Sequence, residues 1–237
     1  MTGEPCQDSC WAQVDIPTSG TATLSIFVSD GAGSAKRGGQ GAELAIEAAA
    51  SFLVEKLAQH EFALSDDFAV ECVDAVRERI YAAAAQEGLT ARDFACTFLG
   101  LISSKNGTLL FQIGDGGIAV DVGNGLEIPV VPMSGEYANM TNFVTDENAM
   151  GIMISKSFSE PAVRAAAFSD GIQRLAMNMV TNTPHEPFFT PKFNVLASVS
   201  EDQEDQVRNA LEEFLSSAAV NERTDDDKTL ALAVLVQ

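Results

Sequence analysis

The chain has 237 residues, of which 46% are hydrophobic, so it is long enough to bury one sizeable core, and we expect a single domain over residues 1–237. Its 34 acidic and 14 basic residues give a net charge of −20, which disfavours nucleic acid and anionic membrane surfaces as partners. No charged and apolar leader opens the sequence and no apolar run is long enough to span a bilayer, so we expect a cytoplasmic protein.

Apolar runs and helical spacings alternate along the chain in mixed order. Strand length or strand composition is found at 22–28, 94–102, 108–113, 117–122, 163–168 and 229–236. Amphipathic helices are predicted at 42–59, 67–86, 171–180 and 202–218. The turn Asn106-Gly107 joins consecutive strands, which points to antiparallel pairing and an α+β fold rather than a Rossmann succession. Ser65 is a plausible cap of the second helix.

Familiar phosphate and nucleophile motifs do not fit the glycine-rich loop that follows the first predicted strand. A Walker-type loop places its lysine directly before Ser or Thr, whereas Lys36 precedes Arg37. A nucleophile elbow would set Ser34 in G-x-S-x-G with a histidine partner, and a dinucleotide fingerprint would need glycine at position 36. The 4 cysteines lack paired C-x-x-C spacing, which indicates reduced thiols rather than a zinc site.

Aspartate followed by glycine recurs where apolar runs end. The pattern occurs at 27–31, 111–117 and 167–171, and the acidic stretch 224–229 stands directly before the last predicted strand. Strand ends far apart in sequence can meet at one edge of a sheet, and clustered carboxylates repel one another unless a cation neutralises them. Hard ions with oxygen ligands, Mg²⁺ or Mn²⁺, suit such a cluster. The alternative is that each Asp-Gly pair only closes a turn.

Taken together, these motifs resemble the metal-dependent Ser/Thr protein phosphatases of type 2C, the PPM family, in its bacterial branch. The resemblance runs along the whole chain. It is carried by Pro5-Cys6-Gln7-Asp8, Asp30-Gly31-Ala32-Gly33, Phe94-Ala95-Cys96-Thr97, Gly114-Asp115-Gly116, Ser169-Asp170-Gly171, Asp226-Asp227-Lys228-Thr229, Gly135-Glu136-Tyr137-Ala138-Asn139 with Phe143-Val144-Thr145, and Pro187-Phe188-Phe189. It implies a four-layer αββα sandwich of two antiparallel sheets flanked by helices.

The resemblance also implies a binuclear Mg²⁺ or Mn²⁺ site. Asp30 would bridge two ions, and Gly31 would lend its carbonyl. Asp170 and Asp226 would complete the shell of the first ion. The remaining expected ligands are Asp115, matching an acid that helps hold a third, weaker ion, and Asp8, or else Gln7, at the N-terminal acidic motif.

The implied reaction is hydrolysis of phosphoserine and phosphothreonine on proteins by a metal-bridged water, without a covalent intermediate. The partner would be a phosphorylated protein in kinase-linked signalling. Members of the family carry a phosphate-contacting arginine near the N-terminus that is missing here, and Lys36 or Arg37 could replace it. Ala32 stands where many eukaryotic members have a histidine.

Two alternatives stay open at this point. Gln7 takes the place of an acid, which favours a catalytically weak or inactive phosphatase-like domain that binds phosphoproteins or acts as a scaffold. Asp225-x-Asp227-x-Thr229 matches the D-x-D-x-T of haloacid-dehalogenase-type phosphotransferases. That chemistry needs its aspartate at the end of a strand, whereas these acids precede one, so the direction of the chain disfavours it.

Overall fold

Two antiparallel sheets form the centre of the molecule in the computed structural model, which describes residues 6–16, 21–59, 63–132 and 141–236. Within these residues the larger sheet has five strands in the order β1-β2-β3-β4-β6, and the smaller has three in the order β10-β7-β5. The strands of the larger sheet are β1 (Asp8–Asp15), β2 (Thr23–Asp30), β3 (Phe98–Ser104), β4 (Gly107–Ile113) and β6 (Ile154–Phe158). Those of the smaller sheet are β5 (Gly117–Asp121), β7 (Arg164–Phe168) and β10 (Leu230–Val234).

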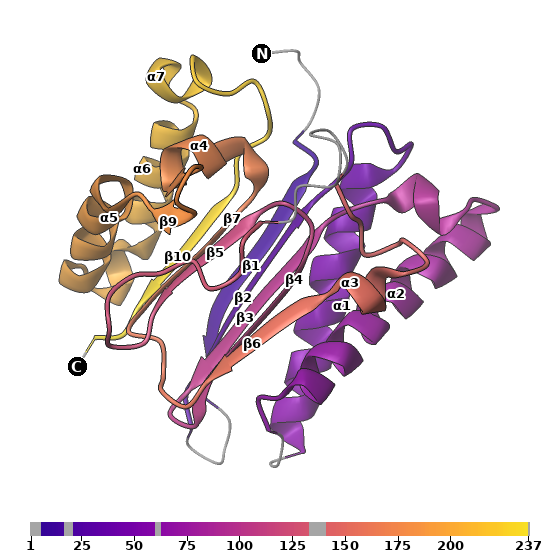
Figure 1. The fold of residues 1–237 in the computed structure, drawn as a ribbon, viewed down its shortest axis with the longest axis horizontal. Coiled ribbons are helices and arrows are strands. Elements are labelled where there is room, and N and C mark those ends of the chain that lie inside the picture. Colours follow the sequence, from indigo (N-terminus) through magenta and orange to yellow (C-terminus); the bar gives the residue numbers. More distant parts are fainter. Residues whose placement is uncertain (1–5, 17–20, 60–62, 133–140, 237) are drawn as a thin grey trace.

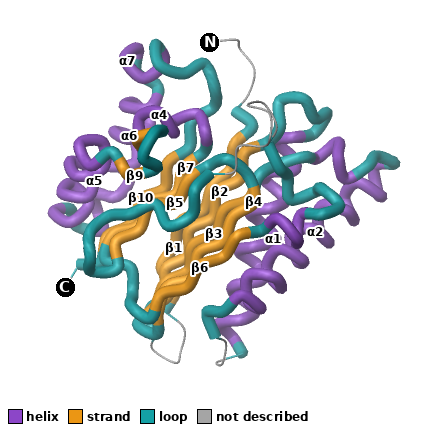
Figure 2. Tube along the Cα trace, viewed as in Figure 1, coloured by secondary structure: helices purple, strands orange, loops and turns teal. Residues whose placement is uncertain are grey.

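Helices cover the outer face of each sheet. α1 (Gly38–Ala58) and α2 (Asp66–Glu87) lie on the side of the larger sheet, while α4 (Gln173–Ala176), α5 (Glu186–Ser198), α6 (Glu204–Leu215) and α7 (Ala218–Asn221) gather on the side of the smaller one (Figure 1). Figure 2 shows the strands as a central body between the two groups of helices. The α+β class and the four-layer αββα sandwich are therefore confirmed.

Three apolar layers explain why so many strand residues are hydrophobic. One lies between α1, α2 and the larger sheet, one lies between the sheets, and one lies between the smaller sheet and α5 with α6. Neighbouring side chains of a strand point to opposite faces. Accordingly, Phe98 and Leu99 enter different layers, as do Phe27 and Val28. Strands buried on both faces have continuous apolar runs, which is why the central ones were predictable.

Helix α2 begins and ends as its sequence predicts. The backbone N–H of Phe68 donates to the Ser65 hydroxyl, and Gly88 closes the helix with a φ of +67°. Helix α1 instead starts four positions earlier than expected, at Gly38. A Cβ at Gly41 would lie 2.1 Å from the carbonyl oxygen of Phe94, so the glycines there permit close packing inside a helix.

Several expected boundaries were wrong for local reasons. The edge strands β1 and β6 were missed, because most of their side chains are exposed or half-buried and give no apolar run. The expected helix 171–180 is a 3₁₀ turn (Asp170–Ile172), the short α4, and then the hairpin strand β8 (Met177–Asn178), which pairs with β9 (Thr183–Pro184). The expected strand 94–102 starts only at Phe98, since 91–94 form a 3₁₀ turn.

The expected helix 202–218 divides into α6 and α7, preceded by a 3₁₀ turn (Glu201–Gln203). A further one-turn helix, α3 (Ala149–Ile152), precedes β6. Cys6, Cys10, Cys72 and Cys96 are all free thiols, as expected. Among the described helices, none combines the length and hydropathy needed to cross a bilayer.

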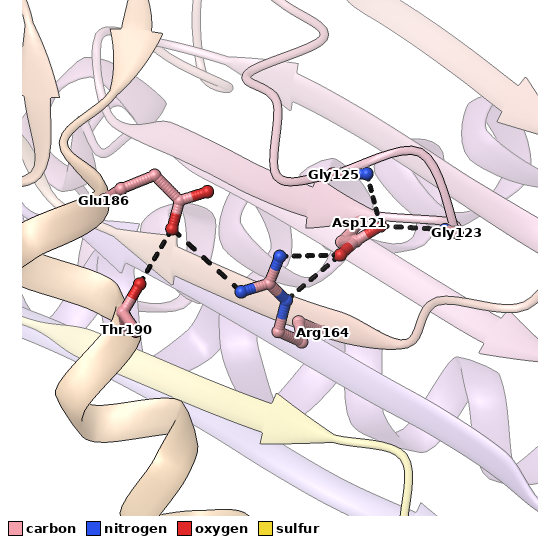
Figure 3. Close-up of polar contacts among 6 residues, drawn as sticks. All are labelled: Asp121, Gly123, Gly125, Arg164, Glu186 and Thr190. Atoms are coloured by element: carbon pink, nitrogen blue, oxygen red, sulfur yellow. Dashed lines mark hydrogen bonds and ion pairs between the residues drawn. The ribbon is translucent and has the colours of Figure 1, made fainter.

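A polar network fixes one end of the smaller sheet to α5 (Figure 3). Asp121 on β5 faces Arg164 on β7, and its Oδ2 accepts from Arg164 Nη2 at 2.7 Å and Nε at 3.0 Å. Its Oδ1 accepts from the backbone N–H groups of Gly123 and Gly125 at 2.8 and 3.0 Å. Arg164 also lies 4.0 Å from Glu186 on α5. Hydrogen bonds from Arg164 and from the two backbone N–H groups therefore satisfy both carboxylate oxygens of Asp121.

Candidate active site

The opposite end of the strands borders a polar cavity of about 400 Å³. Strands or loops from both sheets supply its walls. The described residues that line it are Gln7, Asp30, Gly31, Ala32, Gly33, Ser34, Thr97, Asp115, Thr141, Phe143, Asp170, Asp225, Asp226 and Asp227. None of these is a lysine, an arginine, a histidine or a cysteine, so the lining carries aspartates without a cationic side chain.

Antiparallel pairing brings the first two acids together. β1 runs away from this edge and β2 returns to it, so Asp8 at the start of β1 stands opposite Asp30 at the end of β2. The Asp30 N–H donates to Thr97 Oγ1 at 3.0 Å, and the Thr97 N–H donates to the Asp30 carbonyl at 2.8 Å. Ser29 Oγ in turn donates to the Thr97 carbonyl at 2.6 Å. The backbone of β2 is thus fixed where it presents Asp30.

Antiparallel pairing also brings the other strand-end acids to this edge. Asp115 lies in the turn between β4 and β5, and Asp170 follows the end of β7 after Ser169. Asp226 precedes β10, which pairs with β7 along the same edge. The Thr229 N–H donates to Ser169 Oγ at 3.0 Å, which ties the two segments together next to these carboxylates. The predicted convergence of Asp30, Asp115, Asp170 and Asp226 is therefore present in the structure.

Glycine is required where the backbones approach most closely. A Cβ on Gly31 would lie 2.3 Å from the carbonyl carbon of Gly38, and one on Gly171 would lie 1.8 Å from the carbonyl oxygen of Asp227. The Gly31 N–H donates to the Gln7 carbonyl at 3.1 Å. The glycine of each Asp-Gly pair thus lets the chain fold tightly around its aspartate.

Burial and mutual repulsion disfavour the ionised form of these acids. Burial is the largest cause that raises the pKa of Asp30, to about 10, and the charges of Asp8 and then Asp170 raise it further. Burial likewise raises the pKa of Asp170 to about 6, with the charge of Asp115 next in size. The pKa values of Asp8 and Asp115 are raised as well, again mainly by burial.

Several buried oxygens in this cluster have no donor. No hydrogen bond of ordinary geometry reaches either carboxylate oxygen of Asp8, Oδ1 of Asp170 or Oε1 of Gln7. Ser169 and Thr229 lie close enough to Asp8 to lower its pKa in part, yet burial prevails. Unpaired buried acceptors are costly, and a divalent cation would satisfy them and favour the charged carboxylates.

The donor set therefore fits a hard divalent cation. Carboxylates with a nearby backbone carbonyl are the ligands that Mg²⁺ and Mn²⁺ prefer. Among the described residues, no three acidic, imidazole or thiol side chains already form a complete metal-binding group. Ion binding would consequently require rotations of side chains that already surround a common space.

The two cations proposed for phosphate do not line this cavity. Lys36 Nζ lies 3.0 Å from Asp93 Oδ1, and its side chain is 72% exposed. Arg37 Nε lies 3.6 Å from Glu87 Oε2. Both must leave an acidic partner before they can contact a phosphate in the cavity, so their role stays a prediction.

Sequence reasoning did not assign a role to several lining residues. Asp227 accepts a 2.7 Å hydrogen bond from the Gln7 N–H and adds a carboxylate beside Asp226. Thr141 and Phe143 reach the cavity from a loop that has neither strand nor helix periodicity. The run of acids 225–227 was the available signal for Asp227. Phe143 belongs to the Phe143-Val144-Thr145 motif of the family resemblance but had no role, whereas only tertiary contacts reveal Thr141.

Comparison with known proteins agrees with this geometry. A family model described as Protein phosphatase 2C matches residues 1–216. The curated Serine/threonine-protein phosphatase 3 of Escherichia coli (strain K12) is 53% identical over 230 residues, covering 97% of this chain and 91% of that protein.

Solved structures extend the likeness to the fold. The serine/threonine phosphatase of S. agalactiae superposes with a TM-score of 0.62 at 12% identity and covers 100% of this chain and 96% of that one. The serine/threonine phosphatase of Staphylococcus aureus gives 0.59 at 12% identity, covering 99% and 91%. With the strand-end carboxylates in place and 1–216 of its 237 residues matched by the family model, the chain belongs to the protein phosphatase 2C family.

Proposed function

We propose that the chain hydrolyses phosphoserine and phosphothreonine on proteins, with two Mg²⁺ or Mn²⁺ ions held by the strand-end carboxylates. The observation that carries this is the group of acids around a cavity whose described lining residues include no cationic side chain, together with buried oxygens of Asp170 and of the neighbouring Asp8 that no hydrogen bond of ordinary geometry reaches. Membership of the family and the 53% identity with a serine/threonine-protein phosphatase support the same activity.

The ligand assignment follows the sequence motifs. Asp30 would contact both ions, with the carbonyl of Gly31 beside it. Asp170 and Asp226 would complete the set around one ion, and Asp8 would supply charge on the other side. We place a third, weaker ion near Asp115. Bound ions would supply a water that loses its proton near neutral pH and would offset the charge of the transferring phosphoryl group.

The chain's own residues set the course of the reaction. The hydrogen bonds of Ser29 and Thr97 hold the end of β2, so Asp30 is presented at a fixed place. No described lining residue is a cysteine or a histidine, and the acids 225–227 precede a strand instead of ending one, so we favour direct attack by water on phosphorus without a covalent enzyme intermediate. The bond from phosphorus to the serine or threonine oxygen breaks, and since Ala32 offers no proton, the leaving alcohol is protonated by water.

The deciding experiment measures hydrolysis of p-nitrophenyl phosphate and of a phosphothreonine peptide with Mn²⁺ or Mg²⁺, and then with chelator. We expect turnover that the chelator abolishes. Asp170→Asn should lose this activity while circular dichroism stays native. Substantial activity of the variant, at metal concentrations that saturate the parent chain, would remove the proposed site.

Gln7 supports a second candidate function, a phosphatase-like module that binds phosphoproteins without turnover. An amide replaces an acid in the cavity lining, so the ion nearest to it loses a negative ligand. Under this alternative the phosphothreonine peptide binds in the presence of Mn²⁺ but is recovered intact. Gln7→Glu should then raise the activity, whereas a fully active parent chain would exclude the module.

A further inference from the structure

Helix α2 holds a loop that forms part of the cavity wall. Arg77 Nη1 donates to the carbonyl oxygens of Val144 and Asp146, the latter at 2.7 Å. Tyr81, one turn further along α2, donates from its hydroxyl to the Thr145 carbonyl at 3.2 Å. Three successive carbonyls of an irregular segment are thus satisfied by two side chains of one helix, where loop carbonyls ordinarily face water.

The two side chains also support each other. Arg77 Nη2 donates to the Tyr81 hydroxyl at 3.2 Å, and the guanidinium carbon lies 5.3 Å from the centre of the tyrosine ring. A planar guanidinium can bridge two carbonyls and stack on a ring at once, which a lysine cannot do. We call residues 141–146 the wall segment, and Arg77 with Tyr81 the brace.

The wall segment connects the brace to the acids. Its Thr141 hydroxyl donates a short hydrogen bond to Asp115 Oδ2. The Val144 N–H donates to the Cys96 carbonyl at 2.9 Å, directly before the threonine that fixes Asp30. Phe143 lies between these two anchors in the sequence, and its N–H donates to Asp146 Oδ2 at 2.8 Å. The position of Phe143 is therefore determined from both sides.

Phe143 differs in character from the rest of the cavity. It is the one large apolar side chain among the described lining residues, and the others are acidic, polar or small. It is half-buried, and it belongs to none of the three apolar layers formed by the described residues. An aromatic ring that lines a carboxylate cavity, and that joins no apolar layer of the described residues, is suited to contact the carbon atoms of a bound substrate.

We propose that Phe143 contacts the carbon side chain of the phosphorylated residue and that Arg77 and Tyr81 act as positioning residues that hold the wall segment for this contact. The proposal rests on the proposed function, because it assigns a substrate contact to the same cavity. The acids and their ions would bind the phosphoryl group, whereas Phe143 would contact the carbon atoms of the phosphoester.

The test uses the full chain in Mn²⁺ and a non-hydrolysable phosphonate analogue of a phosphothreonine peptide, so that binding is measured apart from turnover. We expect Phe143→Ala to raise the Kd roughly fivefold to tenfold, as for the loss of one partly buried aromatic contact. Phe143→Leu should restore most of the affinity. Arg77→Gln should raise the Kd roughly threefold or more, and Tyr81→Phe should raise it less.

A double-mutant cycle separates positioning from a general loss of stability. If Arg77 acts through the wall segment, the Arg77→Gln/Phe143→Ala variant should bind within about twofold of Phe143→Ala alone, because the brace then has nothing left to position. Arg79→Gln is the matched control: it lies on the same helix, pairs with Glu47 at 3.7 Å, and should leave the Kd unchanged.

Additive effects of the two changes, an unchanged Kd in Arg77→Gln, or an equal loss in Arg79→Gln would each overturn the proposal. If Arg77→Gln does not fold, Tyr81→Phe decides, and an unaltered Kd in that variant counts against the brace. Failure of the parent chain to bind the analogue also overturns it. Binding that follows the expected pattern while the parent chain hydrolyses no phosphopeptide would reject only the proposed activity.

Discussion

Asp121→Asn should lower the stability of the protein without touching the candidate active site. The change keeps the shape of the side chain and an oxygen for Gly123 and Gly125, but it removes the negative charge that faces Arg164. Asp121 is only 7% exposed, and the arginine side chain is 24% exposed, so the guanidinium would lose its partner in a largely covered place.

The magnitude follows from the contacts. Removing one partner of a fully buried pair costs about 3–5 kcal/mol, and an exposed pair contributes about 0–1 kcal/mol. The arginine side chain of this pair is 24% exposed, so the pair is not fully buried, and we expect a loss of about 2 kcal/mol, between these two limits. For a chain of 237 residues this corresponds to a fall in Tm of roughly 4–8 °C.

The ion pair of Asp121 and Arg164 also makes the stability of the protein depend on pH, and the direction of that dependence follows from the pKa of Asp121. Burial raises the pKa of Asp121, but the hydrogen bonds from Arg164 and from the two glycine N–H groups outweigh it, and the net pKa is lowered. A carboxyl with a depressed folded-state pKa stabilises above its unfolded pKa of about 3.9, and that contribution disappears as the pH falls through the folded value. The stability gap between the parent chain and Asp121→Asn should therefore narrow below about pH 4.

Thermal unfolding of the two proteins at pH 7 and below pH 4 checks this. Glu186→Gln is the matched control, since Glu186 lies 4.0 Å from the same arginine with a side chain that is 49% exposed, and it should change Tm by less than about 2 °C. If Asp121→Asn also changes Tm by less than about 2 °C at pH 7, the reasoning is refuted. It is also refuted if the difference in Tm between the parent chain and Asp121→Asn is larger below pH 4 than at pH 7.

Three further changes probe the site. Asp30→Asn should abolish metal-dependent hydrolysis. It should also abolish the rise in Tm that Mn²⁺ gives the parent chain, which corresponds to a stabilisation of about 2.7 kcal/mol at 100 times the Kd, and retention of that rise would exclude Asp30 as a ligand. Gly171→Ala should destabilise the fold, because its Cβ would overlap the Asp227 carbonyl, and a Tm equal to that of the parent chain would contradict this. Lys36→Ala/Arg37→Ala should raise KM for a phosphopeptide. An unchanged KM would show that both cations only pair with their acidic partners and do not contact the substrate.

The sequence predicts those parts of the fold whose signal is local. Strands β2, β3, β4 and β7 are buried on both faces, so each is a short apolar run, and only their ends were uncertain. The edge strands offer no such run. Helix α5 carries Pro187 and Pro191, which argue against a helix, yet Pro187 occupies the first turn and the aromatic residues of the helix are buried against the smaller sheet.

The site was predictable to the extent that it is built from strand ends. Each Asp-Gly pair follows an apolar run, and antiparallel pairing then leaves few arrangements in which Asp30, Asp115 and Asp170 do not share an edge. The brace has no counterpart in sequence patterns. Arg77 precedes the carbonyls that it holds by 67 and 69 positions, and no periodicity connects a helix surface with a loop over that separation.

The two ends of the smaller sheet show why unsatisfied charge is the informative feature. Asp121 is buried, but an arginine and two backbone N–H groups satisfy it, and nothing more is needed to explain it. Asp170, after the neighbouring strand, is half-buried among other acids, and its Oδ1 is a buried oxygen that no hydrogen bond of ordinary geometry reaches. Since a buried carboxylate without compensation costs stability, the fold maintains an arrangement that favours a cation at one end and not at the other. Mn²⁺ should therefore raise the Tm of Asp121→Asn as much as it raises that of the parent chain. It should leave the Tm of Asp170→Asn nearly unchanged. An equal rise in all three proteins would place the ion away from the strand-end acids.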